Sequence, residues 1–501
     1  MAIIGLLALL AAVLGLAARS AQQEAEQRRA DAESLMSFML GDFVDKLRPL
    51  GRLDLLDDVS AKALGYLSGT DLNSSAPATL AHRVKALQLI AEVGVAQGRH
   101  SAAREALTAA DRILQRQLTS STADVPVLKA AGANAFWLGR LYFDQGEWKQ
   151  AARNMLLYRD YSARIVNAMP DDPDGWMELS YAHNSYGSAL LRQNDITAAA
   201  TAFTRSVELK QRVFSRQPDR PGITVDLSNA LSWLASTKVK LGELQEAMRL
   251  YRQEEALLAT AHQKEPTNGL WAQRLSSSIW RQADLLQAFG DPGAGAAYSR
   301  AANLMSPLIQ RDPSNKMWQR HAYSIRLREL AEANDVDIAG TSAVYRHLQQ
   351  LRDQTPEVRE LQHLVAKAGE QLARSYARRG DHSLAQTTLA SALAIYRELR
   401  SKGTDVALDA NYARALLLSS EIGLAQGNDD ATAGCHAALQ ILATARDSND
   451  YLTLAPLVEA SLCAGQSKIA LSIMARLEAM GYRDARYLKN ISKYKTEKGN
   501  I

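Results

Sequence analysis

The sequence is poor in the residues that build disulfide-rich, metal-binding or all-β domains. Only two of its 501 residues are cysteines, and only 6% are aromatic. Cys435 and Cys463 cannot form a disulfide framework, and no His or Cys stands near either of them at metal-ligand spacing. We interpret them as two small buried thiols. A single bridge between them is the alternative, and it requires an oxidising compartment.

An excess of charge of one sign is also lacking. The 58 basic and 54 acidic residues leave a formal net charge of +4, and no run of Lys or Arg is interleaved with aromatic residues. Nucleic acid is therefore excluded as the expected partner. With 47% hydrophobic residues, 29 Gly and 13 Pro, the chain is instead typical of a folded, helix-rich protein, long enough for several domains or one elongated array.

Motifs for catalysis or metal binding are missing as well. The nine histidines stand singly, and the sequence contains no HExxH, no GxSxG, no phosphate-binding glycine loop and no kinase signature. We therefore assign no catalytic residue, no metal ligand and no cofactor-binding residue. The expected protein is not an enzyme and carries no cofactor.

What the sequence does have is a strict spacing. Helix-breaking loop residues recur every 48 positions, at Gly98, Gly146, Asn194, Gly242 and Gly290. Prolines repeat the same period in fixed phase, at Pro170, Pro218, Pro266 and Pro313. Two independent markers with one period indicate an array of repeats. The pattern continues less regularly through Asn334, Gly380, Gly427 and Gly465, which gives nine units.

Residue size repeats with the loops. Small residues stand seven positions before each of the first five loop residues, at Ala91, Gly139, Gly187, Ala235 and Ala283. Larger residues stand nine positions after the first four of them, at Leu107, Met155, Phe203 and Tyr251. Small residues let two successive helices approach closely, and the larger residues are expected to fill the groove between them.

These features resemble the tetratricopeptide repeat (TPR) family, whose helix–turn–helix units span about 34 residues. The resemblance rests on the small–loop–small spacing, on Tyr142 and Tyr376 before their loops, on "GEWKQAARNM" and "GELQEAMRLY", and on the closing prolines. It implies an all-α, right-handed superhelical solenoid with a period of about 48 over residues 80–490, followed by a polar tail at 491–501. The extra length predicts longer helices than in the family.

By the geometry of that family, residues six and ten positions before each loop should face an inner groove. The candidate protein-binding residues are Phe136, Arg140, Asn184, Ser188, Ser232, Ser236, Trp280 and Asp284. Phe136, Arg140 and Trp280 are side chains of the kind that anchor peptides, although Trp280 fits core packing equally well. The expected partner is a protein or a peptide.

The N-terminus is uncharged from Ala2 to Ala18, which predicts a transmembrane helix over residues 1–20. A cleaved signal peptide and a buried helix are the alternatives. Residues 21–79 then form a helical joint next to the membrane. Its aspartates, Asp42, Asp45, Asp54, Asp57 and Asp58, fall largely off the apolar stripes and indicate a solvated joint rather than a carboxylate site.

This join resembles that of bacterial envelope signalling proteins, in which a cytoplasmic module precedes a single transmembrane helix and a long repeat region. No such module stands upstream here, so either the chain is a natural truncation or its start lies further upstream. The resemblance implies an inner-membrane protein with periplasmic repeats, whereas Arg19, Arg28 and Arg29 favour cytoplasmic repeats. We expect the periplasmic side and a sensing or interaction role in signalling; a scaffold or assembly factor for an envelope complex is the alternative.

Overall fold

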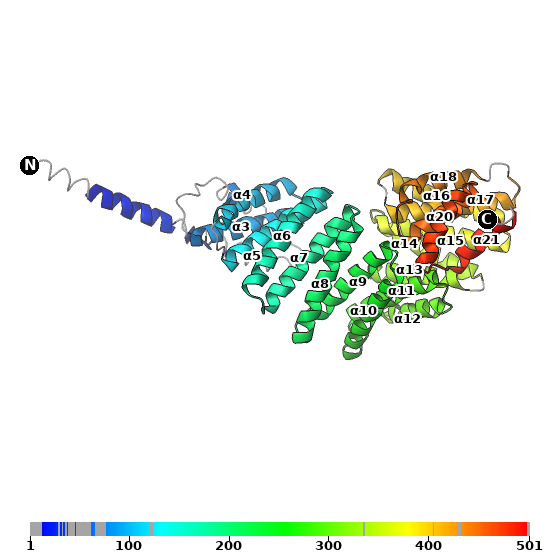
Figure 1. Ribbon diagram of the computed structural model, residues 1–501, viewed down its shortest axis with the longest axis horizontal. Coiled ribbons are helices and arrows are strands. Elements are labelled where there is room, and N and C mark those ends of the chain that lie inside the picture. Colours follow the sequence, from blue (N-terminus) through cyan, green and yellow to red (C-terminus); the bar gives the residue numbers. More distant parts are fainter. Residues whose placement is uncertain are drawn as a thin grey trace, which may run out of the picture. The chain divides into compact units, whose positions relative to one another are not determined.

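The computed structural model describes residues 13–28, 31–32, 34–35, 38, 46, 62–65, 77–119, 124–333, 336–403, 405–428 and 432–497. Within these residues the protein is all-α and contains no strand (Figure 1). The predicted fold class is confirmed in this respect. The five aspartates of the predicted joint at residues 21–79 lie outside the described residues, as does the loop marker Asn334.

The N-terminal helices of the array alternate between first and second members of antiparallel pairs. Their bounds are α3 (Pro77–Ala96), α4 (His100–Leu118), α5 (Val125–Asp144), α6 (Trp148–Ala168), α7 (Pro173–Arg192) and α8 (Ile196–Arg216). The next helices are α9 (Ile223–Lys240), α10 (Leu244–Lys264), α11 (Gly269–Ala288), α12 (Ala294–Arg311), α13 (Lys316–Glu332) and α14 (Ile338–Gln354). The helices from α3 to α12 have 18 to 21 residues each, so the prediction of long helices is confirmed.

The C-terminal helices are shorter toward the end of the chain. They are α15 (Arg359–Arg379), α16 (His382–Ser401), α17 (Val406–Ala425), α18 (Ala433–Ile441), the 3-10 turn η2 (Ala443–Ala445), α19 (Tyr451–Cys463), α20 (Ser467–Ala479) and α21 (Ala485–Glu497). The nine helix pairs from α3/α4 to α19/α20 coincide with the nine units of the sequence, and α21 follows as a single helix.

The loop residues adopt the conformation that their chemistry predicts. Gly98, Gly146, Gly242 and Gly290 have φ between 69° and 77°, and Asn194 has φ 62°. This left-handed region suits glycine, and asparagine tolerates it better than most residues. The four predicted prolines each stand two residues after the last residue of a second helix, as at Pro170 after Ala168.

The small and large residues of the repeat meet between the helices of a pair. A Cβ added at Gly139 would lie 2.9 Å from the Cε of Met155, and one added at Gly187 would lie 3.0 Å from the ring of Phe203. Met155 is 4% exposed and Phe203 is fully buried. The predicted packing of small residues against larger groove residues is therefore confirmed in α5/α6 and α7/α8.

The chain divides into two compact units, Met1–Pro218 and Asp219–Ile501. In the first unit, one apolar core forms between α3, α4 and α5 around Leu87, Leu107 and Ile113. A second core lies between α5, α6 and α7 around Ala151, Met155 and Ala182. Each core joins one pair to the next, as expected for stacked repeats.

The second unit also stacks pair on pair, but its C-terminal segment returns to its first helices. The backbone N–H of Arg483 donates to the carbonyl oxygen of Ala288 at 2.7 Å, and the Gln287 amide donates to Asp484 at 3.1 Å. Lys240 lies 3.7 Å from the carboxylate of Asp450. These contacts connect the segment from α19 to α21 with the ends of α9 and α11, more than 190 residues earlier in the case of Gln287.

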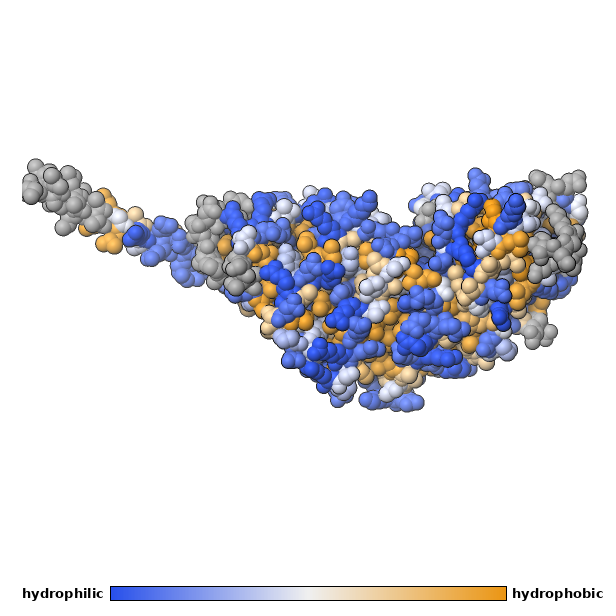
Figure 2. All heavy atoms as spheres, in the orientation of Figure 1, coloured by the Kyte–Doolittle hydropathy of each residue, from blue (hydrophilic) through white to orange (hydrophobic). Residues whose placement is uncertain are grey.

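The N-terminal segment does not match its prediction. Residues 13–28 form an exposed helix whose start is hydrophobic and whose remainder is hydrophilic (Figure 2), and residues 1–12 lie outside the described residues. Apolar residues end at Ala18, and charged residues such as Arg19 and Glu24 follow. Among the described helices, none combines the length and the apolar character needed to cross a membrane. The predicted single-pass location in the bacterial inner membrane is therefore wrong.

Candidate ligand-binding cavity

The second unit contains a cavity with a volume of about 650 Å³. Its lining comes from the first helices of successive pairs, α11, α13, α15, α17 and α19, and from residues 482–494 in and before α21. None of the described residues of α12, α14, α16, α18 or α20 lines it. The cavity is thus the inner surface of this unit, and we call it the inner cavity.

One residue position of the repeat supplies a charged side chain from each pair. Six positions before the loop residues of the last five pairs stand five lining residues, which we call the inward row: Asp284, Arg328, Arg374, Glu421 and Glu459. Glu370, ten positions before its loop, also lines the cavity. Residues spaced by three, four and seven positions share one face of a helix, so one face of each first helix is turned inward.

Much of this charge is paired across or along helices. Arg328 donates through Nε to Asp284 at 2.8 Å, and the same carboxylate accepts the hydroxyl of Tyr298 at 2.7 Å. Arg374 pairs with Glu370 at 3.0 Å, and both of these side chains are only 12% exposed. Arg328 also lies over the ring of Trp280, 4.6 Å from its centroid.

Three cations of the cavity, Lys367, Arg414 and Arg486, have no ion pair with a carboxylate among the described residues. Lys367 on α15 is half-buried and forms neither a hydrogen bond nor an ion pair there. The charge of Arg328, together with burial and the charge of Arg414, lowers the pKa of Lys367 to about 7. Arg414 on α17 donates to the carbonyl oxygen of Leu452 at 2.9 Å and to the Asn411 side chain at 3.3 Å, both neutral acceptors.

Tyrosines form another part of the wall. Tyr451, Tyr482 and Tyr487 are 5–8% exposed and line the cavity, and their hydroxyls form no hydrogen bond with the described residues. Neighbouring rings lie 5.3 and 5.2 Å apart between centroids. Burial raises the pKa of all three phenols, so the groups stay neutral at ordinary pH. The wall therefore combines aromatic faces with hydroxyl groups, a surface that suits amphipathic ligands.

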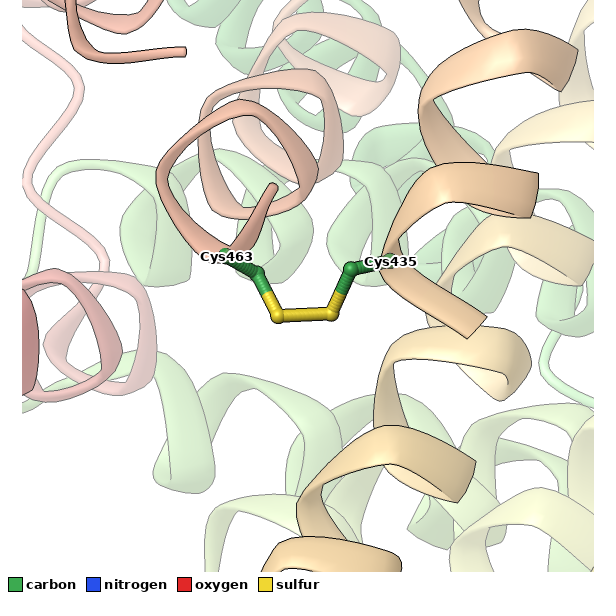
Figure 3. The surroundings of a disulfide bond; sticks show 2 residues. All are labelled: Cys435 and Cys463. Carbon is green, nitrogen blue, oxygen red and sulfur yellow. A yellow bond between two sulfur atoms is a disulfide. The ribbon is translucent and has the colours of Figure 1, made fainter. Parts of the chain in front are cut away.

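A disulfide bond supports the same wall from behind. Cys435 on α18 and Cys463 at the end of α19 are joined, with 5.8 Å between their Cα atoms (Figure 3). Cys435 is fully buried, whereas Cys463 is half-buried and lines the inner cavity. The interpretation as two free thiols is therefore wrong, and the single bridge is the alternative that the structure contains.

The eight predicted groove residues are divided between the two units. Phe136, Arg140, Asn184 and Ser188 lie in the first unit, where Phe136 packs against Tyr158 and the exposed Arg140 pairs with Asp144 on its own helix. Ser232, Ser236, Trp280 and Asp284 lie in the second unit. Of the eight, only Asp284 lines the inner cavity. Ser236 bonds to the hydroxyl of Tyr251, and Trp280 packs against His321 and Arg328.

Sequence reasoning missed the inward row beyond Asp284, although the signal was present. The same six-position rule applied to Asn334, Gly380, Gly427 and Gly465 gives Arg328, Arg374, Glu421 and Glu459. The predicted groove residues all lie in the regular pairs. The tyrosines and Arg486 could not be found in this way, because the segment after α20 is not a repeat unit.

Outside the inner cavity, the described residues include a buried carboxylate with a raised pKa but no metal-binding group. Glu254 on α10 is 5% exposed, and burial raises its pKa to about 7, but it does not line the inner cavity. No group of three His, Cys, Asp or Glu side chains within the described residues is arranged to hold a metal ion.

No family model matches the sequence, and no curated protein matches it. Among solved structures, the fold is similar to the aspartyl phosphate phosphatase F of Bacillus subtilis, with 10% identity over 81% of this chain and 94% of the other and a TM-score of 0.47. It is also similar to the apo form of the quorum sensor NprR of B. thuringiensis, with 10% identity over 88% and 97% and a TM-score of 0.40.

A third similar structure is a tetratricopeptide repeat protein from Parabacteroides merdae, with 13% identity over 65% of this chain and 99% of the other and a TM-score of 0.34. The structural neighbours are thus TPR-like helical repeat proteins.

Proposed function

We propose that this protein binds a protein segment or a short peptide and that the inner cavity of its second unit is the binding site. The observation that carries the proposal is the lining. Every element that contributes is a first helix or the closing segment, and charged, aromatic and amide side chains line the cavity beside alanines and leucines. Binding, not catalysis, is the activity that such an inner surface supports.

The size and composition of the cavity favour a short segment over a folded domain. A volume of about 650 Å³ lies within the usual range of small-ligand and peptide pockets, about 300–1,000 Å³. Tyr451, Tyr482 and Tyr487 offer apolar faces with free hydroxyls, and Asn490 and Gln371 offer amides. This mixture suits a peptide backbone with its donors and acceptors.

Two more specific proposals concern the arrangement of the helix pairs and the role of the second unit. We propose that the pairs continue one another as a TPR-like superhelical array and that the second unit acts as the sensing region of a signalling protein. The closing contacts of Arg483 and Asp484 with α11 support the sensing role, because a ligand in the cavity would touch both sides of this closure. Ligand occupancy and closure would then be thermodynamically coupled.

A peptide selection followed by a blocking substitution tests the proposal. The full chain is used to select binders from a random peptide library displayed on phage, and the selected peptides are measured by calorimetry. Ala331→Trp places a large ring in the cavity wall and should weaken binding at least tenfold. The matched control is Ala390→Trp, on the exposed face of α16 outside the cavity, which should leave affinity unchanged. Equal affinities of the two variants would contradict the proposed site.

A further inference from the structure

We propose that the inner cavity binds an anionic oxygen group of its ligand, a carboxylate or a phosphate, at Lys367 with Arg328 and Arg414 on either side. The inference rests on the proposed function only for the general location of the site. It adds a ligand chemistry and names the residues that would select it.

The three cations come from consecutive lining helices. Arg328 is on α13, Lys367 on α15 and Arg414 on α17, and all three are half-buried and line the same cavity. First helices of successive pairs lie side by side in a stack of repeats. The three positive side chains therefore come from neighbouring lining helices and border the same cavity.

The cations that line the cavity outnumber the carboxylates that line it by one. Asp284 on α11 pairs with Arg328 at 2.8 Å, and Glu370 on α15 pairs with Arg374 at 3.0 Å. Neither Lys367 nor Arg414 has an ion pair with any described carboxylate. Glu421, Glu459 and Asp484 also line the cavity, as do Arg486 and Lys493, so its six cations and five carboxylates leave a net charge of +1.

A partly buried cation without a counter-ion is unfavourable, because burial removes its hydration. Arg414 at least donates to the carbonyl of Leu452 and to Asn411, whereas the ammonium of Lys367 has no acceptor among the described residues. An anionic oxygen group would supply both the missing charge and the missing acceptor. An ammonium group flanked by two guanidinium groups suits a carboxylate or a phosphate.

The remainder of the cavity indicates where the rest of such a ligand would lie. The three tyrosines and the amides of Gln371 and Asn490 line the same space. A ligand with one anionic end and an amphipathic body would satisfy both regions at once. A peptide with a free C-terminal carboxylate and a small phosphorylated metabolite share this description, and the experiment separates them.

The test measures thermal unfolding and calorimetric binding of the full chain with sodium phosphate, sodium citrate and the library-selected peptides. Each selected peptide is made with a free carboxylate and as the C-terminal amide. Phosphate and citrate are compared with sodium chloride at equal ionic strength. We expect at least one of these anions to raise the unfolding midpoint beyond the chloride effect, and a preference of free-acid peptides over amides would identify the peptide terminus as the source of the anion.

Lys367→Met should raise the unfolding midpoint of the ligand-free protein and weaken binding of the responsive anion at least tenfold. Lys367→Arg should keep the anion affinity within about threefold. The matched control is Lys210→Met, which removes a buried lysine of the first unit, 3% exposed, that lies 5.1 Å from the ring centroid of Tyr181. This control should leave the anion affinity unchanged even if it lowers stability.

Three results would overturn the proposal: no anion-specific response of the wild type, unchanged anion affinity in Lys367→Met, or an equal loss in Lys210→Met. Peptides that bind with the same affinity to Lys367→Met would remove the anion site and leave the proposed function standing. Phosphate bound through Lys367, with no peptide bound by the chain, would support the anion site and contradict peptide binding.

Discussion

The same helical repeat forms different surfaces in the two units. In the first unit, the position six residues before the loop carries Arg140 and Ser188, which make contacts within their own helices. In the second unit, the same position carries Arg328 and Arg374, which form ion pairs with residues that line the inner cavity. The repeat period determines the positions of these residues. The return of the C-terminal segment to α11 makes the inner face of the first helices part of a cavity wall.

Stability should be lowered most by an added methyl group at the contact between α11 and the C-terminal segment. Gly290 has φ 69°, and a Cβ there would lie 2.5 Å from the carbonyl oxygen of Arg483. Gly290→Ala should lower the free energy of unfolding by about 4 kcal/mol, from backbone strain, overpacking and loss of a closing hydrogen bond. Gly465→Ala has the same type of φ, 75°, and open space around it, so a loss of about 1 kcal/mol is expected. Similar losses in denaturant unfolding of the two variants would refute the special role of Gly290.

Loss of the disulfide should destabilise the second unit and leave the first unit unchanged. Replacing both cysteines, as Cys435→Ala with Cys463→Ala, should reduce the free energy of unfolding by about 3.5 kcal/mol, the loop-closure entropy expected for a loop of 28 residues. Hydrogen exchange followed by mass spectrometry should show faster exchange in α18 and α19 and unchanged exchange in α4 to α7. Faster exchange spread evenly over both units would contradict this account.

The inward position itself can be compared between the units by one substitution. Arg374→Met leaves Glu370, which is 12% exposed, without its partner and should cost about 2 kcal/mol. Arg140→Met breaks a pair in which the arginine is 54% exposed and should change stability by less than about 0.5 kcal/mol. Equal effects on the midpoint of urea unfolding would show that the inner cavity has no energetic consequence.

The pH dependence of the free energy of unfolding should include a contribution from Lys367. Its pKa is about 7 in the fold against an ordinary value of 10.5, so the unfolded chain binds more protons between these values and stability rises with pH in that window. The contribution between pH 7 and 9 should be on the order of 1 kcal/mol, less than the full shift implies because the ammonium borders a cavity. The stability gain over this range, measured by unfolding at each pH, should be smaller in Lys367→Met. An identical gain would show that Lys367 titrates normally.

The repeat can be predicted from the sequence, whereas the contact between the C-terminal segment and α11 cannot. Gly146, Gly242 and Pro170 mark helix ends through local backbone chemistry, and Gly139 against Met155 follows from size periodicity, so both could be predicted. The contact between Arg483 and Ala288 joins two segments that share no sequence pattern, so no local sequence rule predicts it. The same holds for the pairing of Cys435 with Cys463, where the spacing left two alternatives open.

The membrane prediction failed for a related reason. A run of apolar residues was taken as a span, but among the described residues that run is short and continues as a charged helix after Ala18. The candidate groove was placed on the most regular repeats because their pattern was clearest. The inner cavity is lined instead mainly by the irregular ones, in which every inward position carries a charged residue.

The most direct measurement of the central claim is hydrogen exchange of the full chain with and without a library-selected peptide. Binding in the inner cavity predicts slower exchange in α13, α15, α17, α19 and α21 and unchanged exchange in α3 to α8. Slower exchange in α5 and α7, around Phe136, Arg140 and Ser188, with none in the second unit, would contradict the claim and place the binding groove in the first unit.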